Sequence, residues 1–284
     1  MKQFRILNLE SDMPSDSDLI KVAEGYPARE CKNLEQDTLG FRELPGTRGE
    51  QVLVVEGTTF VYAELLRFRR SVPSSVRDRE VRKRTKKLSE NGEEITSKLR
   101  KEIKEEVTRE LLPKMPQMET VIPLVLDVTG NRIWLGATSD SVVDKCFQLL
   151  RNAGLSIRVE LWFEGIDLSR WMNDWVLGRQ ELPTDIRLGM KAKLADPHEP
   201  KATITISNEE LTDEELQAVA ESRTVVSLEL ASKGLSFTLG HDGSFKSLKF
   251  EGDGDWEDLA HELGVKLTEF RHALNNVAAC VDAQ

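Results

Sequence analysis

The chain has 284 residues, of which 39% are hydrophobic and 31% are charged, and its formal net charge is −10. This composition is typical of a soluble globular protein of two or three domains, and it excludes a largely disordered chain. No apolar run approaches the roughly 20 residues that span a bilayer, so we expect no membrane segment. Glu10 follows Met1 too closely for a secretory signal, and we therefore expect a cytoplasmic protein.

The cysteines and histidines give no sign of a disulfide framework or a metal site. Cys31, Cys146 and Cys280 are far apart in the sequence, odd in number, and include no Cys-x-x-Cys pair. The four histidines have neither His-x-x-x-His spacing nor a neighbouring Cys-x-x-Cys. We expect reduced thiols, no metal and no cofactor.

The first part of the chain is predicted to be a mixed β/α unit, because apolar residues alternate in short runs between turn signals. The expected elements are a strand at 4–9, a helix capped by Asp16-Ser17-Asp18, a turn-rich loop at 39–46, and strands at 52–55 and 59–66 around Gly57.

Residues 74–112 are predicted to form a pair of charged helices. Ser75 with Asp78 matches a capping box, and the first helix is expected to end near Leu88. The second is expected from about Glu93 to Leu112, with an apolar residue every fourth position. Such a narrow apolar stripe cannot bury a core alone, so we expect this pair to pack against another domain or a second copy.

The rest of the chain is predicted to contain two further β/α stretches. The expected strands are 121–127, 132–136, 157–163, 201–207, 225–230, 235–239 and 245–250. The expected helices are 142–154, 168–177 with Trp171 and Trp175 in its core face, one opened by Thr212-Asp213-Glu214-Glu215, and a last one over about 256–281. The Asp/Gly-rich stretch 251–258 is predicted to be a linker.

Together these elements predict an α+β fold, a multi-lobed chain of small mixed β/α units with a long charged helical hairpin. The expected domains are a central α+β domain of residues 1–72 with 119–165, the helical hairpin at 73–118, and a second α+β domain with a C-terminal helix at 166–284.

Basic charge is concentrated in residues 67–87, which hold ten Lys/Arg and two acids, or 10 − 2 = +8, so the rest of the chain carries −10 − 8 = −18. This segregation favours a protein that grips a polyanion, because each neutralised phosphate releases condensed counterions. The alternative is a solvated helix, or one that pairs with an acidic face of a partner subunit. The candidate phosphate contacts are Arg77, Arg82, Lys83, Arg84, Lys86, Lys87 and Lys114.

The sequence contains no nucleotide-binding, serine-hydrolase or zinc-protease motif. A nuclease needs several carboxylates that converge on Mg²⁺, and Asp127, Asp140 and Asp144 are the candidates for that role. Helix capping explains Asp140 and Asp144 more simply, so we expect a protein without enzymatic activity.

Three stretches, in order and at similar spacing, make the chain resemble the bacterial RdgC recombination-associated protein family. The first is Arg67-Phe68-Arg69-Arg70-Ser71-Val72-Pro73-Ser74 with the helical pair closing at Leu111-Leu112-Pro113-Lys114. The second is Thr138-Ser139-Asp140 with the helix ending at Leu149-Leu150-Arg151. The third is Glu210-Leu211-Thr212-Asp213-Glu214-Glu215 with the hairpin from Asp242 to Phe250. The resemblance covers roughly residues 1–280, and the chain resembles a divergent member, as a phage or mobile element would carry.

The resemblance implies a homodimer that closes into a ring around double-stranded DNA, binds it without sequence preference and hinders RecA during recombination. The expected partners are therefore duplex DNA, a second copy of the chain, and RecA or another recombination protein. The hairpin would make the dimer contact and face the DNA. The expected location is the nucleoid in the cytoplasm, or the host cytoplasm for a phage-encoded protein.

Three positions depart from the family pattern. Pro116 stands where the family tends to place an aromatic residue that contacts DNA, and Asn208 and Glu209 stand where it has a basic and polar pair. Each lost cation should remove about one counterion-release contribution. The alternative function is therefore an interaction protein with little DNA binding, which inhibits RecA or a RecBCD-type nuclease complex through its acidic surface.

Overall fold

The computed structural model describes residues 1–55, 59–208, 214–252 and 258–281. The described strands are β1 Gln3–Leu9, β2 Asp37–Phe41, β3 Val52–Val55, β4 Phe60–Arg70, β5 Gln117–Asp127, β6 Arg132–Leu135, β7 Val159–Leu161, β8 Arg187–Ala195, β9 Thr203–Ser207, β10 Thr224–Ser232, β11 Leu235–Gly240 and β12 Ser244–Phe250. The described helices are α1 Asp16–Gly25, α2 Ser74–Glu90, α3 Ser97–Leu111, the 3-10 turn η1 Leu112–Lys114, α4 Asp140–Asn152, α5 Leu168–Val176, α6 Glu214–Glu221 and α7 Leu259–Val281.

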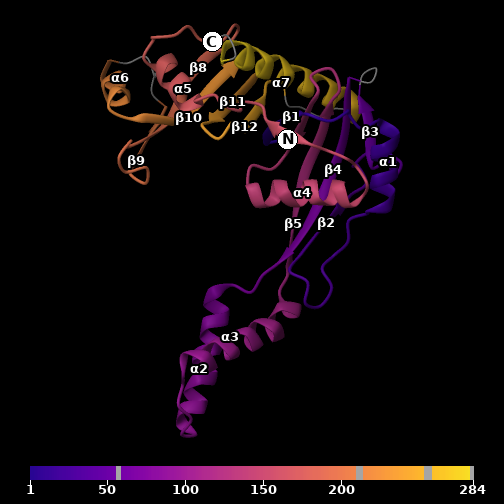
Figure 1. Cartoon of the computed structure of the whole chain (residues 1–284), viewed down its shortest axis with the longest axis vertical. Helices are drawn as coiled ribbons and strands as arrows, with labels where there is room; N and C mark the ends of the chain where they lie inside the picture. The colour runs from indigo at the N-terminus through magenta and orange to yellow at the C-terminus, as the bar shows by residue number, and fades with distance from the viewer. Residues whose placement is uncertain (56–58, 209–213, 253–257, 282–284) are drawn as a thin grey trace.

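In the described part of the chain, the body of the molecule is one large antiparallel sheet of twelve strands with helices packed on it, and a helical arm extends from it (Figure 1). The strand order is β2-β4-β5-β6-β1-β12-β11-β10-β8-β9, with β3 also paired to β4 and β7 to β1. β1 joins the two halves, because it pairs with β6 on one edge and with β12 on the other. The strands that we expected in separate units therefore belong to a single sheet.

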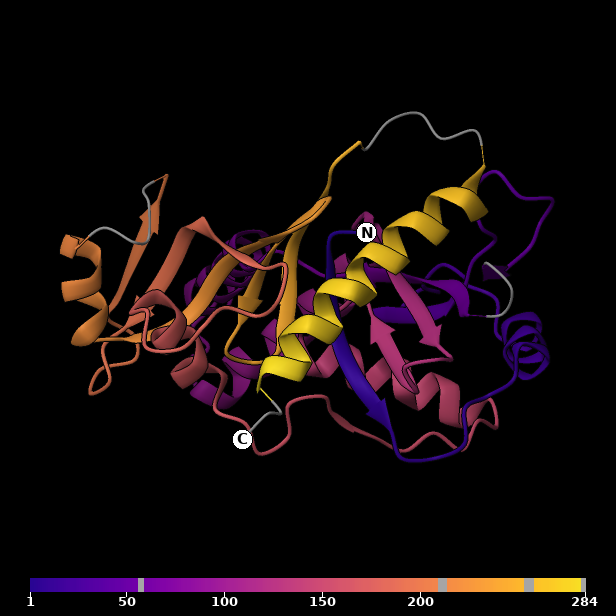
Figure 2. The ribbon, with the colours of Figure 1, turned by 90° about the horizontal axis from the view of Figure 1, so that it is seen from above.

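Both faces of β1 are buried, and they define two cores. Phe4 and Ile6 point to the face covered by α7, whereas Leu7 and Leu9 point to the face covered by α1 and α4. Figure 2 shows α7 lying obliquely across the strands of both halves. Phe270 of α7 lies 5.2 Å from the ring of Phe4, measured between centroids, so the helix packs directly on the central strand. Burial of such aromatic side chains stabilises this layer.

The structure corrects several sequence predictions. Residues 39–46 were expected to be a loop, but residues 39–41 belong to β2, where Gly40 lets the strand approach the backbone of Pro27 and Ala28. Residues 42–46 lie outside helices and strands, as expected. The expected capping box is also wrong: α2 starts at Ser74 after Pro73, without a side-chain cap. β8 at Arg187–Ala195 had no predicted counterpart.

Parts of four predictions lie outside the described residues: the turn at Gly57, the cap at Thr212-Asp213, most of the linker at 251–258, and the expected helix start at residue 256. Across the described helices, none has the length and apolar character needed to cross a membrane.

Candidate nucleic-acid interface

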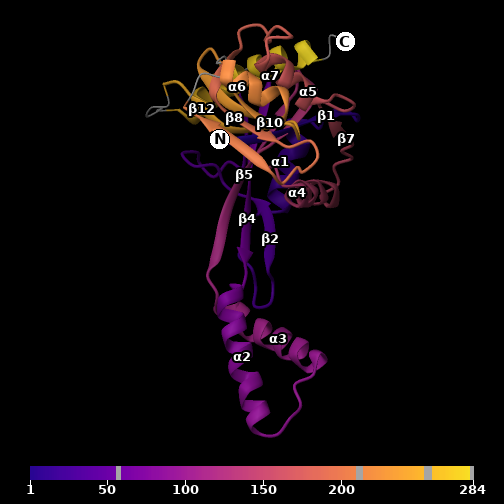
Figure 3. The same ribbon diagram turned by 90° about the vertical axis from the view of Figure 1, so that its left-hand side faces the viewer.

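The candidate phosphate contacts lie on or beside the arm, which is formed by α2 and α3 at the end of the long β4–β5 ribbon (Figure 3). The two helices share a very small core of Val81, Ile103 and Val107, flanked by partly buried leucines. Thr96 caps α3, since its side chain accepts a hydrogen bond from the backbone N–H of Leu99. The arm is thus held together by few apolar contacts, which leaves most of its surface to charged side chains.

Arg84 joins the two helices through ion pairs. Its guanidinium contacts Glu110 of α3 at 2.5 Å and Glu80 of its own helix at 3.5 Å. The hydrogen bond from Arg84 lowers the pKa of the Glu110 carboxyl and raises the pKa of Arg84 itself. Of the seven candidates, Arg84 is therefore committed to an intramolecular network that also includes Glu106 at 3.9 Å.

The outer face of α2 carries a stripe of cations. Arg79, Arg82, Lys83 and Lys86 are exposed and follow one another at spacings of three, one and three residues, which places them on one side of the helix, away from Val81. Lys86 lies 3.7 Å from Glu90, and both of these side chains are mostly exposed. Exposed pairs of this kind are weak and exchange readily with solvent or ligand. Arg79 was not among the candidates, although the helical spacing would have included it.

The remaining candidates lie at the edge of this stripe or away from it. Lys87 is exposed at the side of α2, and Arg77 is only partly exposed and lies 3.2 Å from Asp78. Lys114 is exposed in η1, at the opposite end of the hairpin, where its charge helps to lower the pKa of Glu110 after the larger effect of Arg84. The structure therefore brings Arg82, Lys83 and Lys86 together, with Lys87 one turn after Lys83 at the edge of the stripe, and leaves Arg77, Arg84 and Lys114 at separate places.

Two other arginines of the basic segment are part of the scaffold. Arg67 binds Asp37 through two hydrogen bonds of 2.8 and 2.5 Å, and Lys145 binds the same carboxylate. Burial alone would raise the pKa of Asp37, but these two cations hold it below its usual value. These side chains stabilise the sheet, so the charge counted along the sequence overstates the charge available to a ligand.

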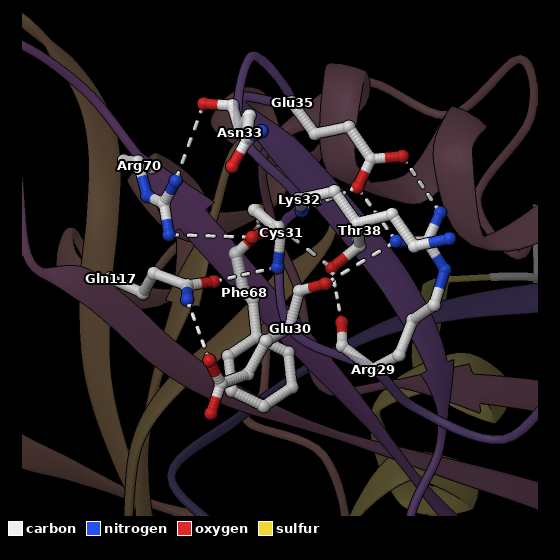
Figure 4. Close-up of polar contacts among 10 residues, drawn as sticks. All are labelled: Arg29, Glu30, Cys31, Lys32, Asn33, Glu35, Thr38, Phe68, Arg70 and Gln117. Atoms are coloured by element: carbon white, nitrogen blue, oxygen red, sulfur yellow. Dashed lines mark hydrogen bonds and ion pairs between the residues drawn. The ribbon is translucent and has the colours of Figure 1, made fainter. Parts of the chain in front are cut away.

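Arg70, at the end of β4, is buried and fixes the loop of residues 29–36 (Figure 4). It donates to the backbone carbonyls of Cys31 at 3.3 Å and Asn33 at 3.4 Å. Gln117 of β5 accepts from the Cys31 N–H at 2.7 Å and donates to Glu30 at 2.9 Å. This network ties the loop to both strands of the ribbon where the arm begins, so the base of the arm is a well-connected structure.

A second cationic surface lies on the sheet and was missed by the sequence reasoning. Residues paired across a ladder share a face. Ser227 of β10 pairs with Lys193 of β8, which pairs with Thr205 of β9. Two residues earlier in β8, and therefore on the same face, Lys191 pairs with Ser207. In the described part of the chain, the helices that pack on these strands, α5, α6 and α7, lie on the opposite face. These residues lie side by side only because of the strand register, which the sequence does not reveal.

We call this surface the uncovered sheet face, defined by Lys191, Lys193, Thr205, Ser207 and Ser227, and it continues past Glu229 of β10 to Thr238 of β11 and Lys246 of β12. Lys191 and Lys193 are exposed, and Lys246 lies 3.4 Å from Asp242. The arm extends away from the helices α5 and α7, on the side of this face (Figures 1 and 3).

The three aspartates considered for a metal-dependent nuclease do not come together. Asp127 is fully buried on the α7 face, 3.5 Å from Arg271, and burial raises its pKa. Asp140 is exposed on α4, on the other face of the sheet, where it pairs with Arg5 at 2.9 Å, and Asp144 follows one turn later. Among the described residues there is no group of three or more His, Cys, Asp or Glu that could hold a metal ion.

Two of the three divergent positions can be placed. Pro116 is exposed between η1 and β5. Asn208 follows β9 with φ of 61°, and its backbone N–H donates to Met190 at 2.9 Å. Glu209 lies outside the described residues.

The chain belongs to the RdgC family: the family model described as "Putative exonuclease, RdgC" matches residues 1–265. It is 25% identical over 254 residues to the recombination-associated protein RdgC of Pseudomonas fluorescens strain Pf0-1, covering 88% of this chain and 83% of the relative. It is also 25% identical over 236 residues to the protein of the same name from Pseudoalteromonas atlantica, covering 81% and 76%. The names of these relatives refer to recombination, and the family match confirms the resemblance seen in the sequence.

Proposed function

We propose that this protein is a recombination-associated, non-enzymatic protein that binds double-stranded DNA without sequence preference. The observation that carries the proposal is the stripe of Arg79, Arg82, Lys83 and Lys86, which is exposed on one side of α2. Cations on one face of a helix contact phosphates without reading bases, because the phosphate backbone is the same for every sequence.

The uncovered sheet face supplies a second set of contacts to the same duplex. Its exposed lysines Lys191 and Lys193 and the hydroxyls of Thr205 and Ser207 are side chains that bind phosphate oxygens. From the family resemblance we further propose that the protein forms a homodimer that closes a ring around DNA and hinders RecA. The arm, with only three buried apolar residues, gains stability from a partner surface in such a dimer.

The first experiment measures binding to labelled duplex DNA by fluorescence anisotropy across a salt series. Binding to B-form DNA changes with salt at a log–log slope of about −0.9 per phosphate contact. The variant Arg82→Glu, Lys83→Glu, Lys86→Glu should bind far more weakly and with a shallower slope. A variant with the same charge change at Lys32, Lys201 and Lys233, which are exposed elsewhere, is the matched control. Unchanged affinity and slope in the α2 variant would remove α2 from the interface.

The sheet face is tested separately with Lys191→Ala and Lys193→Ala together. If both contact phosphates, the slope should become shallower by about 1.8, because two contacts are lost. Light scattering measures the dimer. Slow exchange onto closed-circular competitor DNA, relative to linear DNA of equal length, is the expected result for a ring.

The second candidate function is an interaction protein that inhibits RecA or a RecBCD-type complex with little DNA binding of its own. It is favoured by Pro116 and Asn208, where the family pattern has DNA-contacting residues, and by the net charge of −18 outside the basic segment. A pull-down that recovers a recombination protein, together with no binding to duplex DNA at low salt, would support it. Incubation of plasmid DNA with Mg²⁺ or Mn²⁺ tests the nuclease activity that the family description suggests, and we expect intact DNA.

A further inference from the structure

A cleft at the base of the arm is distinct from both cationic surfaces. It lies between the outer side of α3 and the loop of residues 29–36 and has a volume of about 500 Å³. Figure 3 shows α3 lying next to the loop that precedes β2. We call it the α3–loop cleft, and its lining residues are Leu34, Gln36, Lys101, Lys104, Glu105, Thr108, Arg109 and Leu112.

The cleft combines an apolar floor with a cationic rim. Leu34 is 55% exposed and supplies most of the apolar surface of the cleft, and Leu112, which is buried beneath the helix end, closes the bottom of the cleft. The methylene stems of Lys101, Lys104 and Arg109 add to this surface while their charged ends stay in solvent. Glu105 is the one acid among the lining residues, which gives the cleft a charge of 3 − 1 = +2.

The wall that carries Leu34 is held in place by the network at the arm base. Arg70 binds the carbonyls of Cys31 and Asn33 (Figure 4). The backbone N–H of Arg70 also donates to the carbonyl of Gln36 at 2.8 Å. Leu34 thus lies between two residues that are both tied to β4. A large apolar side chain held exposed by an ordered loop is preorganised to bury itself against a ligand, since little conformational entropy is then lost.

We propose that the α3–loop cleft binds an acidic peptide segment of a partner protein that carries a bulky apolar side chain. The apolar residue would contact Leu34 and Leu112, and flanking carboxylates would pair with Lys101, Lys104 and Arg109. Charge complementarity favours this occupant over a neutral or basic peptide. It also favours a peptide over duplex DNA, because phosphates gain nothing from an apolar floor and the α2 stripe offers cations without one. The inference stands independently of DNA binding by α2.

The test is a selection of random twelve-residue displayed peptides on the full-length protein, followed by binding measurements with labelled synthetic copies of the enriched peptides. We expect enrichment of peptides with several acids beside an aromatic or aliphatic residue. Lys104→Glu and Leu34→Ser should each weaken peptide binding about tenfold or more. The first substitution removes a charge contact to the peptide carboxylates, and the second removes the apolar contact. The affinity should also fall with added salt, since the rim charges are exposed to solvent.

Matched controls make the test specific to the cleft. Lys98→Glu introduces the same charge change on α3 outside the cleft, and Met118→Ser removes another side chain that is 66% exposed. Both controls should bind the peptides as the unchanged protein does, and circular dichroism should show that all variants are folded.

Three results would overturn the proposal. The first is failure to enrich such peptides, or enrichment of peptides that bind the cleft variants normally. The second is loss of duplex DNA binding by Lys104→Glu with no peptide ligand, which would assign the cleft to DNA. The third is loss of self-association in the same variants with no peptide ligand, which would assign it to a second copy of the chain.

Discussion

The arm should unfold independently of the sheet, and truncation of Ile103 is the sharpest perturbation of it. Ile103 and Val107 are buried between α2 and α3, and with Val81 they form the buried apolar core of the hairpin. Replacing a buried isoleucine by alanine costs about 2–4 kcal/mol through lost burial and the cavity left behind. Because every 1.4 kcal/mol is about a factor of ten, local opening of the arm should become about 30- to 700-fold more frequent in Ile103→Ala.

Hydrogen exchange measured by mass spectrometry distinguishes local from global opening. Peptides from α2 and α3 should exchange faster by this factor in Ile103→Ala, whereas peptides from β1, β11 and β12 should keep their protection. Lys98→Ala, an exposed substitution on α3, is the control and should change neither region. Equal loss of protection in the arm and the central strands would refute the reasoning, because it would show that the arm unfolds only together with the sheet.

Three further predictions concern side chains whose environment is well defined. Burial raises the pKa of Asp127, so the folded state binds the Asp127 proton more tightly than the unfolded state does, and the protein loses stability as the pH rises from the ordinary pKa value of 3.8. Chemical denaturation at pH 4 and pH 6 should show that Asp127→Asn loses less stability over this range than the unchanged protein. Arg84→Ala should raise the pKa of Glu110 back toward its ordinary value, which carboxyl NMR titration measures, and a pKa that stays low would mean that Arg84 is not the cause. Gly40→Ala should destabilise the protein by about 1–3 kcal/mol in urea unfolding, since its Cβ would lie 2.6 Å from the backbone of Pro27 and Ala28; a neutral effect would show that β2 can shift.

The sequence predicted local structure better than it predicted pairing. The helices α4 and α5 and the hairpin of β11 and β12 were found close to their expected places, because apolar periodicity and turn residues act over short distances. β2 was missed since Gly40 suggests a turn, and its strand conformation depends on pairing with β4, which starts about 20 residues later. The same dependence on distant pairing explains why the union of both halves through β1 was not foreseen.

The candidate site was predicted in part. Helical spacing alone groups Arg79, Arg82, Lys83 and Lys86, so the α2 stripe was accessible to sequence reasoning, although Arg79 was left out. The uncovered sheet face was not accessible, because Lys191 and Lys193 are joined to Ser227 only by the register of β8 on β10. A count of charged residues along the sequence also cannot distinguish a cation that is exposed to solvent from one that pairs with a carboxylate inside the protein.

The distinction between exposed and internally paired cations determines how variants of the basic segment should be interpreted. Loss of DNA binding in Arg70→Ala would not identify a phosphate contact, because Arg70 is buried and holds the loop against β4. The same holds for Arg84, which joins α2 to α3 through Glu110. A true phosphate contact changes the salt slope and leaves hydrogen exchange in the arm unaltered, whereas a scaffold cation alters exchange in the arm or its base. Measured together on Arg82→Ala and Arg84→Ala, these two quantities assign each cation to the ligand or to the fold, and we expect opposite assignments for the two residues.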